Sequence, residues 1–170
     1  MMEPVFSTAY SDRAGGLRIW LPLGTACILG LWGLFANRLA MTAFSALCTA
    51  YVLWNWPYSD PGRVVLRLTE DGVDIDGIGH VAWARVAKAE AVTRKLPKAA
   101  AHVIRIKLTD PPQHSIDPSP AFSRPKWQRK LGKVRGNRID IPSGVLFDPP
   151  EDVAAAFERF LGSRFRRVDA

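Results

Sequence analysis

Two long uncharged stretches fill the first third of the chain: IWLPLGTACILGLWGLFAN at residues 19–37 and LAMTAFSALCTAYVLWNWPYS at residues 39–59. Only Arg38 separates them. A helix needs roughly 20 apolar residues to cross the hydrocarbon core of a bilayer, where each backbone polar group must be paired internally. The two stretches therefore predict a transmembrane hairpin over residues 18–58, with helices at about 19–36 and 40–57.

Aromatic and basic residues at the ends of the stretches predict how the hairpin is oriented. The predicted membrane-interface anchors are Trp20, Trp54, Trp56 and Tyr58, which would form an aromatic belt at one face of the membrane. Four arginines flank the outer ends of the hairpin: Arg13, Arg18, Arg63 and Arg67. Only Arg38 lies in the turn, so the positive-inside rule predicts a multi-pass protein of the inner (plasma) membrane with both termini in the cytoplasm.

Two other interpretations fit the same stretches. The first stretch could be a cleaved signal peptide with Arg13 and Arg18 as its basic region, but a second stretch follows at once. Both stretches could instead be buried helices of a protein that does not span a membrane, although their length and lack of charge favour the hairpin. Cys27 and Cys48 lie near the middle of the two stretches, where they are interpreted as small apolar side chains rather than as a disulfide.

The remainder of the chain predicts one small α+β, mainly β, domain over residues 63–162. Short segments with β-branched or alternating side chains, separated by turns, predict strands. These segments lie at residues 64–69, 73–76, 80–83, 86–93, 103–108 and 138–142. An apolar stripe with acids in its first turn predicts a helix at about 150–161. The expected fold is an antiparallel curled sheet or barrel capped by this helix, between an N-terminal tail (1–17) and a basic tail (163–170).

Three motifs carry a resemblance to a known family. They are Leu66-x-Leu68-Thr69-x-Asp71-Gly72-Val73, His80-Val81-Ala82-Trp83-Ala84-Arg85-Val86 and Ile139-Asp140-Ile141-Pro142. Together with two spans before the domain, they resemble membrane-anchored bacterial pleckstrin-homology-like (PH-like) proteins. The resemblance implies an architecture and no catalytic residues. Eukaryotic relatives often bind phosphoinositides through a basic first hairpin loop, but the corresponding Glu70-Asp71-Gly72 is acidic.

A basic segment between the last two predicted strands is the candidate binding site. Its cations and Trp127 are expected to contact anionic headgroups or a partner, since an aromatic anchor beside cations suits an interface. The candidate residues are Arg124, Lys126, Trp127, Arg129, Lys130, Lys133 and Arg135, and Arg138 follows them without an intervening acid. The alternative is a solvated insertion in which Trp127 packs back on the domain.

The remaining motifs predict no chemistry. The histidines His80, His102 and His114 have no metal-ligand spacing, and His114-Ser115-Ile116-Asp117 in a Pro-rich loop does not predict a catalytic triad. We therefore expect no enzymatic activity, no cofactor and no metal.

The predicted function is a membrane-anchored module that binds a protein partner or anionic headgroups. The alternative is an accessory subunit of a larger membrane complex for transport or the envelope, assembled through the Gly and Ala faces of the hairpin. Nucleic acid is a less favoured partner than a protein or an anionic headgroup.

Overall fold

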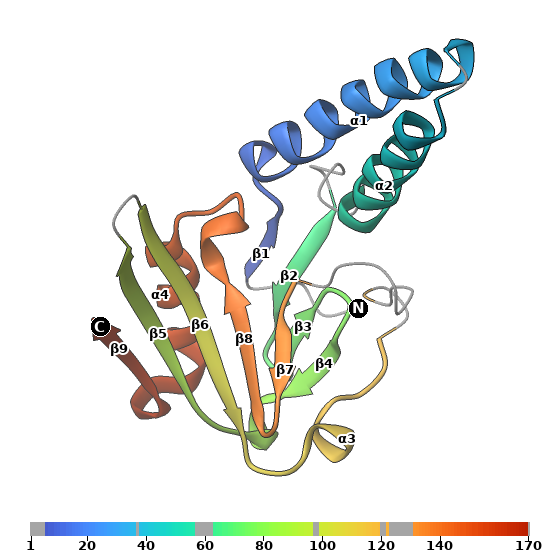
Figure 1. The fold of residues 1–170 in the computed structure, drawn as a ribbon. Coiled ribbons are helices and arrows are strands. Elements are labelled where there is room, and N and C mark those ends of the chain that lie inside the picture. Colours follow the sequence, from blue (N-terminus) through green and yellow to red (C-terminus); the bar gives the residue numbers. More distant parts are fainter. Residues whose placement is uncertain are drawn as a thin grey trace.

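A computed structural model of the chain describes residues 6–36, 38–56, 63–96, 99–119, 122 and 131–169. A long helical hairpin projects from a domain of two sheets (Figure 1). In chain order the elements are β1 (Phe6–Ala9), α1 (Asp12–Phe35), α2 (Leu39–Asn55), β2 (Val64–Leu68), β3 (Gly72–Ile75), β4 (Gly79–Ala82), η2 (Trp83–Arg85), β5 (Val86–Leu96), β6 (Ala99–Leu108), α3 (Pro112–Ser115), β7 (Lys133–Arg135), β8 (Arg138–Pro142), η4 (Ser143–Val145), α4 (Pro150–Leu161), η5 (Gly162–Arg164) and β9 (Phe165–Asp169).

The strands form a four-stranded sheet in the order β1-β2-β3-β4 and a five-stranded sheet in the order β7-β8-β6-β5-β9. All pairs are antiparallel except β5 with β9. Every second side chain is buried in β8 and in the last half of β6, including Ile104, Ile106, Ile139 and Ile141, because alternate residues of a strand point to the same face.

Helix α4 covers the buried face of the five-stranded sheet through Val153, Phe157 and Leu161. Trp83 joins this helix to the turn between the two sheets. Its ring stacks on Phe160 with 5.3 Å between centroids, and its Nε1 donates a hydrogen bond to the Thr69 carbonyl at 2.8 Å. The indole therefore buries apolar area and keeps its polar group paired.

The expected curled sheet or barrel is wrong, because neither sheet closes. The chain leaves the first sheet at η2, and β4 is not bonded to the β5 that follows it. The other edge of β4 instead forms an isolated β-bridge, in which His80 pairs with Asp117 in the segment after α3. The parallel pairing of β9 with β5 also departs from an all-antiparallel sheet.

Both predicted tails contain strands. Within the predicted N-terminal tail, β1 pairs with β2, and the following Tyr10 is buried. Within the predicted basic tail, β9 pairs with β5, and Phe165 belongs to the core. Each strand is only four or five residues long, and each pairs with a segment far away in the chain, which local alternation does not reveal.

The two helices of the hairpin pack closely through glycines. A Cβ added at Gly33 would lie 2.8 Å from Thr42 Oγ1 and 2.9 Å from the Thr42 backbone nitrogen, and one at Gly30 would lie 2.8 Å from Ser45 Oγ. Ser45 donates a hydrogen bond to the carbonyl of Ala26 at 2.7 Å. Gly30, Gly33 and Ser45, part of the small-residue faces that the sequence offers for assembly with a partner, thus pack within the hairpin, as small residues let helices approach.

Within the described residues, no helix combines the length and the hydropathy that a membrane crossing needs. Helix α2 has 17 residues, which cover about 25 Å at 1.5 Å per residue, against roughly 30 Å of hydrocarbon. Helix α1 is longer, but charged residues precede Ile19. This finding contradicts the predicted transmembrane spans at about 19–36 and 40–57. It also contradicts the inner-membrane location with both termini in the cytoplasm.

A buried carboxylate lies where the hairpin meets the domain. Asp76, between β3 and β4, is fully buried. Its Oδ2 accepts a hydrogen bond from the Tyr10 hydroxyl at 3.3 Å, and its Oδ1 lies 3.6 Å from Arg63 Nη2. Tyr10 precedes α1 and Arg63 precedes β2, so this carboxylate contacts the chain on both sides of the hairpin.

Candidate functional site

The structure brings two of the predicted contact residues into a larger basic surface. Lys133 and Arg135 lie exposed on β7. The other five candidates lie outside the described residues, as does Tyr58; these five are Arg124, Lys126, Trp127, Arg129 and Lys130.

A row of four cations crosses four neighbouring strands. In the register of the five-stranded sheet, Lys88 pairs with Lys107, Lys107 with Arg138, and Arg138 with Arg135. Directly paired residues point to the same face of a sheet, so these side chains form one line on the face opposite α4. We call Lys88, Lys107, Arg138 and Arg135 the cation row.

A second row, two residues further along each strand, contains both signs of charge. Its paired residues are Arg166, Glu90, Arg105, Asp140 and Lys133, in that order across the sheet. Asp140 Oδ1 lies 3.3 Å from Arg105 Nε and 3.2 Å from Arg138 Nε. We call this the mixed row.

Glu90 connects the two rows. Lys88 Nζ donates a hydrogen bond to Glu90 Oε1 at 2.7 Å, and Arg105 Nη1 lies 3.8 Å from Oε2. The hydrogen bond from Lys88, together with the charges of Lys88, Arg105 and Arg166, holds the pKa of Glu90 below its ordinary value against the opposing effect of burial. The carboxylate therefore stays ionised and orients the cations around it.

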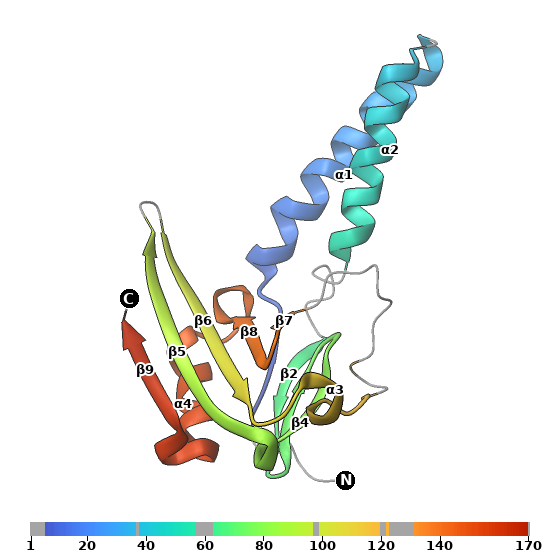
Figure 2. The same cartoon turned by 60° about the horizontal axis from the view of Figure 1, so that its bottom comes forward.

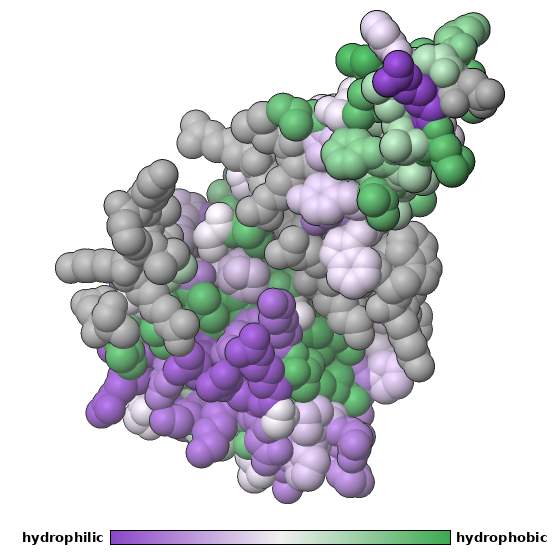
Figure 3. All heavy atoms as spheres, viewed as in Figure 1, coloured by the Kyte–Doolittle hydropathy of each residue, from purple (hydrophilic) through white to green (hydrophobic). Residues whose placement is uncertain are grey.

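The two rows form one basic face with a hollow in it. Seven cations and two acids occupy the rows, so the face keeps a strong positive excess. The hollow has a volume of about 340 Å³ and is lined by Lys88, Glu90, Arg105, Lys107, Asn137 and Arg138. Figure 3 shows hydrophilic side chains gathered over β5, β6 and β8, whereas the hairpin is largely hydrophobic. Such a face attracts anions and steers them toward it.

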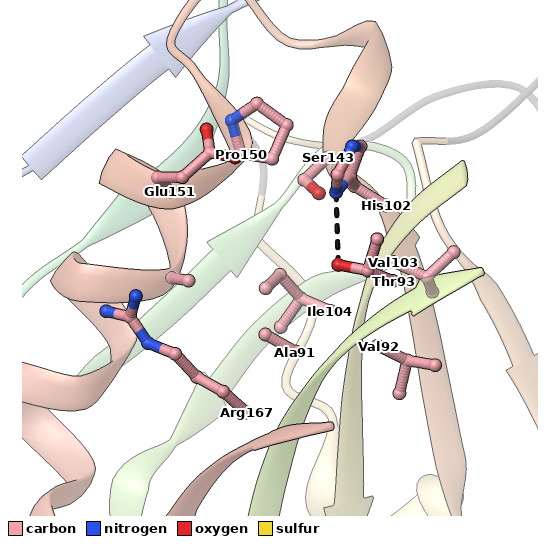
Figure 4. Close-up of a pocket in the computed structure, with 11 residues that line it drawn as sticks. Ala91, Val92, Thr93, His102, Val103, Ile104, Ser143, Pro150, Glu151 and Arg167 are labelled. Atoms are coloured by element: carbon pink, nitrogen blue, oxygen red, sulfur yellow. Dashed lines mark hydrogen bonds between the residues drawn. The ribbon is translucent and has the colours of Figure 1, made fainter. Parts of the chain in front are cut away.

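A pocket of about 270 Å³ lies on the other side of the same sheet, beside the start of α4. It contains a hydroxyl, an imidazole and a carboxylate, from Ser143, His102 and Glu151 (Figure 4). His102 Nδ1 is 3.2 Å from Thr93 Oγ1, in a hydrogen bond. The buried Ser143 Oγ has no hydrogen-bond partner among the described residues. The serine is therefore not bonded to the histidine as a nucleophile is to its base.

The other candidate motifs are structural where they are described. His80 Nδ1 lies 2.9 Å from Asp74 Oδ1 across the β3–β4 pair, and Gly77 and Gly79 turn the chain between these strands with positive φ. In the part of the chain that the structure describes, no three His, Cys, Asp or Glu residues are grouped as metal ligands. Cys27 and Cys48 are free thiols.

The hairpin carries a second exposed surface, which is apolar, in contrast to the basic face. Fourteen of the sixteen large apolar side chains exposed among the described residues lie between Trp20 and Trp56. Phe35 and Leu39, at the turn, are 90% and 85% exposed. The predicted anchors Trp20, Trp54 and Trp56 belong to this surface, at 66%, 47% and 50%.

Comparisons of the chain with models of protein families, with curated proteins and with solved structures find no match. The function has to be argued from the two surfaces. Sequence reasoning missed Lys88, Arg105 and Lys107 as site residues, because each is one cation in an alternating strand. The alternation does reveal that they share a face with their neighbours at i ± 2, but not which strands pair.

Proposed function

We propose that the chain is a non-enzymatic binding module that holds an anionic partner on the basic face of its five-stranded sheet. The observation that carries the proposal is the cation row, in which four strands each contribute one cation in direct register. Like charges placed side by side repel one another. An anion laid along the row removes that repulsion and gains attraction from several cations at once.

The geometry of the flanking acids supports a binding surface rather than a merely solvated one. Asp140 and Glu90 hold Arg138, Arg105 and Lys88 in place, so less side-chain entropy is lost when an anion binds. Lys107 and Arg135 make no ion pair among the described residues and remain available.

Binding of fluorescent polyglutamate by the full-length chain, measured by anisotropy across a range of salt concentrations, tests the proposal. We expect affinity to fall as salt rises. Lys107→Glu should weaken binding about fivefold, as expected for roughly 1 kcal/mol. Arg159→Glu is the matched control, because it makes the same charge change on the exposed side of α4. Equal effects of the two substitutions would refute a specific basic face.

A second candidate function follows from the hairpin. Fourteen large apolar side chains are exposed along it, and large exposed apolar patches mark sites of assembly. We propose that the hairpin docks the chain into a larger assembly through its outer, large apolar side chains. Cross-linking in intact cells should recover complexes that are lost in a variant with Leu31, Phe35, Leu39 and Leu47 changed to Gln, yet are kept in Lys107→Glu. Complexes that survive the four substitutions would exclude the hairpin as the docking element.

A further inference from the structure

The geometry points to an acidic α-helix as the anionic partner, lying across the strands with one carboxylate opposite each member of the cation row. This inference rests on the proposed function and names the partner of the same face. It follows from the spacing of the row, from the acids beside it and from the side chains that the face lacks.

Spacing separates a helix from an extended peptide. Neighbouring strands lie about 4.8 Å apart, so the four cations span about 14 Å. Residues three and four apart on a helix have Cβ atoms about 5–6 Å apart, and eleven residues of helix rise about 16 Å. Four acids at intervals of four, three and four residues therefore nearly match the row. In an extended peptide, side chains on one face are about 6.8 Å apart, and three such steps overshoot the row by about 6 Å.

The charges beside the row fix where the partner lies. Lys107 and Arg135 have no ion-pair partner within the described residues, so they are the two members of the row whose charge no neighbouring acid neutralises. Glu90 and Asp140 lie in the mixed row, two residues along the strands. A partner helix shifted onto that row would bring its acids against these carboxylates, which is unfavourable. The mixed row thus restrains the partner to the cation row by repulsion as well as attraction.

The composition of the face argues for a protein partner. Single-stranded nucleic acids are held by aromatic side chains on which the bases stack, together with cations that follow the backbone. Neither row contains an aromatic residue, and the next residues on the same face, Val92, Val103 and Pro142, are aliphatic or proline. The described face offers charge without stacking, and carboxylates need no more than charge and hydrogen-bond donors.

Two labelled peptides of equal composition test the inference with the full-length chain. Both are alanine-rich, about 18 residues long and matched in helicity by circular dichroism. One carries four glutamates at intervals of four, three and four residues, and the other carries them at every second position. At about 50 mM salt, we expect the first peptide to bind about tenfold more tightly than the second. Lys107→Glu and Arg135→Glu should each remove most of this preference, whereas Arg159→Glu should leave it.

Polyglutamate and heparin, run beside the peptides, separate the outcomes. Equal affinity for both peptides, with salt-dependent polyglutamate binding, overturns the helical partner and leaves the proposed function standing. Binding of heparin alone assigns the face to another class of polyanion and also overturns the inference. If none of the four probes binds, both proposals fall. Lys107→Gln, which removes the charge without reversing it, guards against a folding defect and should show an intermediate loss of preference.

Discussion

At the scale of single residues, the pKa of Glu90 depends on the cations around it. Its pKa is lower in the folded chain than in the unfolded chain. The ionised carboxylate therefore contributes stability that is fully present above the unfolded pKa, about 4.3. That contribution is lost as pH falls through the lower, folded value.

The first prediction is that Glu90→Gln flattens the acid limb of the stability profile. Urea unfolding from pH 7 down to about pH 3 should show the wild-type chain losing stability below about pH 4.5. The variant should lose less over the same interval, because the linked proton uptake is gone. Glu158→Gln, on the exposed face of α4, serves as the control. An acid limb that is unchanged in Glu90→Gln would contradict the assignment.

The second prediction concerns the glycine contacts between the two helices. Gly33→Ala places a Cβ against the backbone of Thr42, which cannot move without moving α2. We expect a loss of about 1–3 kcal/mol in the free energy of unfolding, typical of overpacking. Gly24→Ala is the matched change in the same helix, because nothing lies within 4 Å of its added Cβ. It should instead stabilise by about 0.5–1 kcal/mol. Chemical unfolding followed by helical circular dichroism would measure both, and similar values for the two would argue against this packing.

At the scale of elements, the short strand β1 holds the start of the hairpin to the domain. We predict that changing Tyr10, the residue after β1, to Phe lowers the free energy of unfolding by about 1 kcal/mol, because buried Asp76 loses a hydrogen-bond donor. Ser7→Ala, at an exposed position of β1, should change it by less than about 0.5 kcal/mol. Thermal unfolding monitored by tryptophan fluorescence would compare them. If Tyr10→Phe were as silent as the control, the hydrogen bond to Asp76 would contribute nothing to stability.

The elements that local pattern predicts are those whose partners lie nearby or whose periodicity is strong. Strands β2, β3, β4, β5 and β8 and helix α4 all lie within three residues of the predicted segments, and β6 begins four residues earlier than its predicted segment. Strands β1, β7 and β9 are not among the predicted segments, and β1 and β9 pair with strands far away in the chain, which no local pattern indicates. The uncharged stretches do form the helices α1 and α2. Their lack of charge predicts a helix, but it does not predict whether that helix is surrounded by lipid.

The cation row illustrates the same limit for the binding face. Its members come from positions 88, 107, 135 and 138, and only Arg135 and Arg138 lie in the basic segment that the sequence singles out. Nothing in the local pattern of residues 86–108 indicates that Lys88 will lie beside Lys107 and then Arg138. That arrangement is a property of strand register, which depends on the whole sheet.

At the scale of the whole molecule, the hairpin that carries the exposed apolar side chains projects away from the five-stranded sheet that carries the basic face (Figure 2). We predict that the two surfaces can be changed independently. Changing Leu31, Phe35, Leu39 and Leu47 to Gln should strongly reduce binding of a hydrophobic fluorescent dye, because these side chains are exposed. The same variant should keep its affinity for polyglutamate within about twofold. A large loss of polyglutamate binding in this variant would show that the surfaces are coupled.

Because β1 pairs with β2, the helical hairpin is the connection between two neighbouring strands. Ala9 and Val64 are partners in one antiparallel ladder, so residues 10–63 leave the sheet and return to it at adjacent points. The base of this segment belongs to the core, since Tyr10, Ile19 and Val52 are buried there, whereas its outer end is exposed and can be shortened without touching the ladder. Cutting the chain after the hairpin would instead discard β1 and leave the edge of β2 bare. The natural unit for dissection therefore keeps residues 6–10 and Arg63, because Tyr10 and Arg63 contact Asp76, and shortens only the outer part of the hairpin.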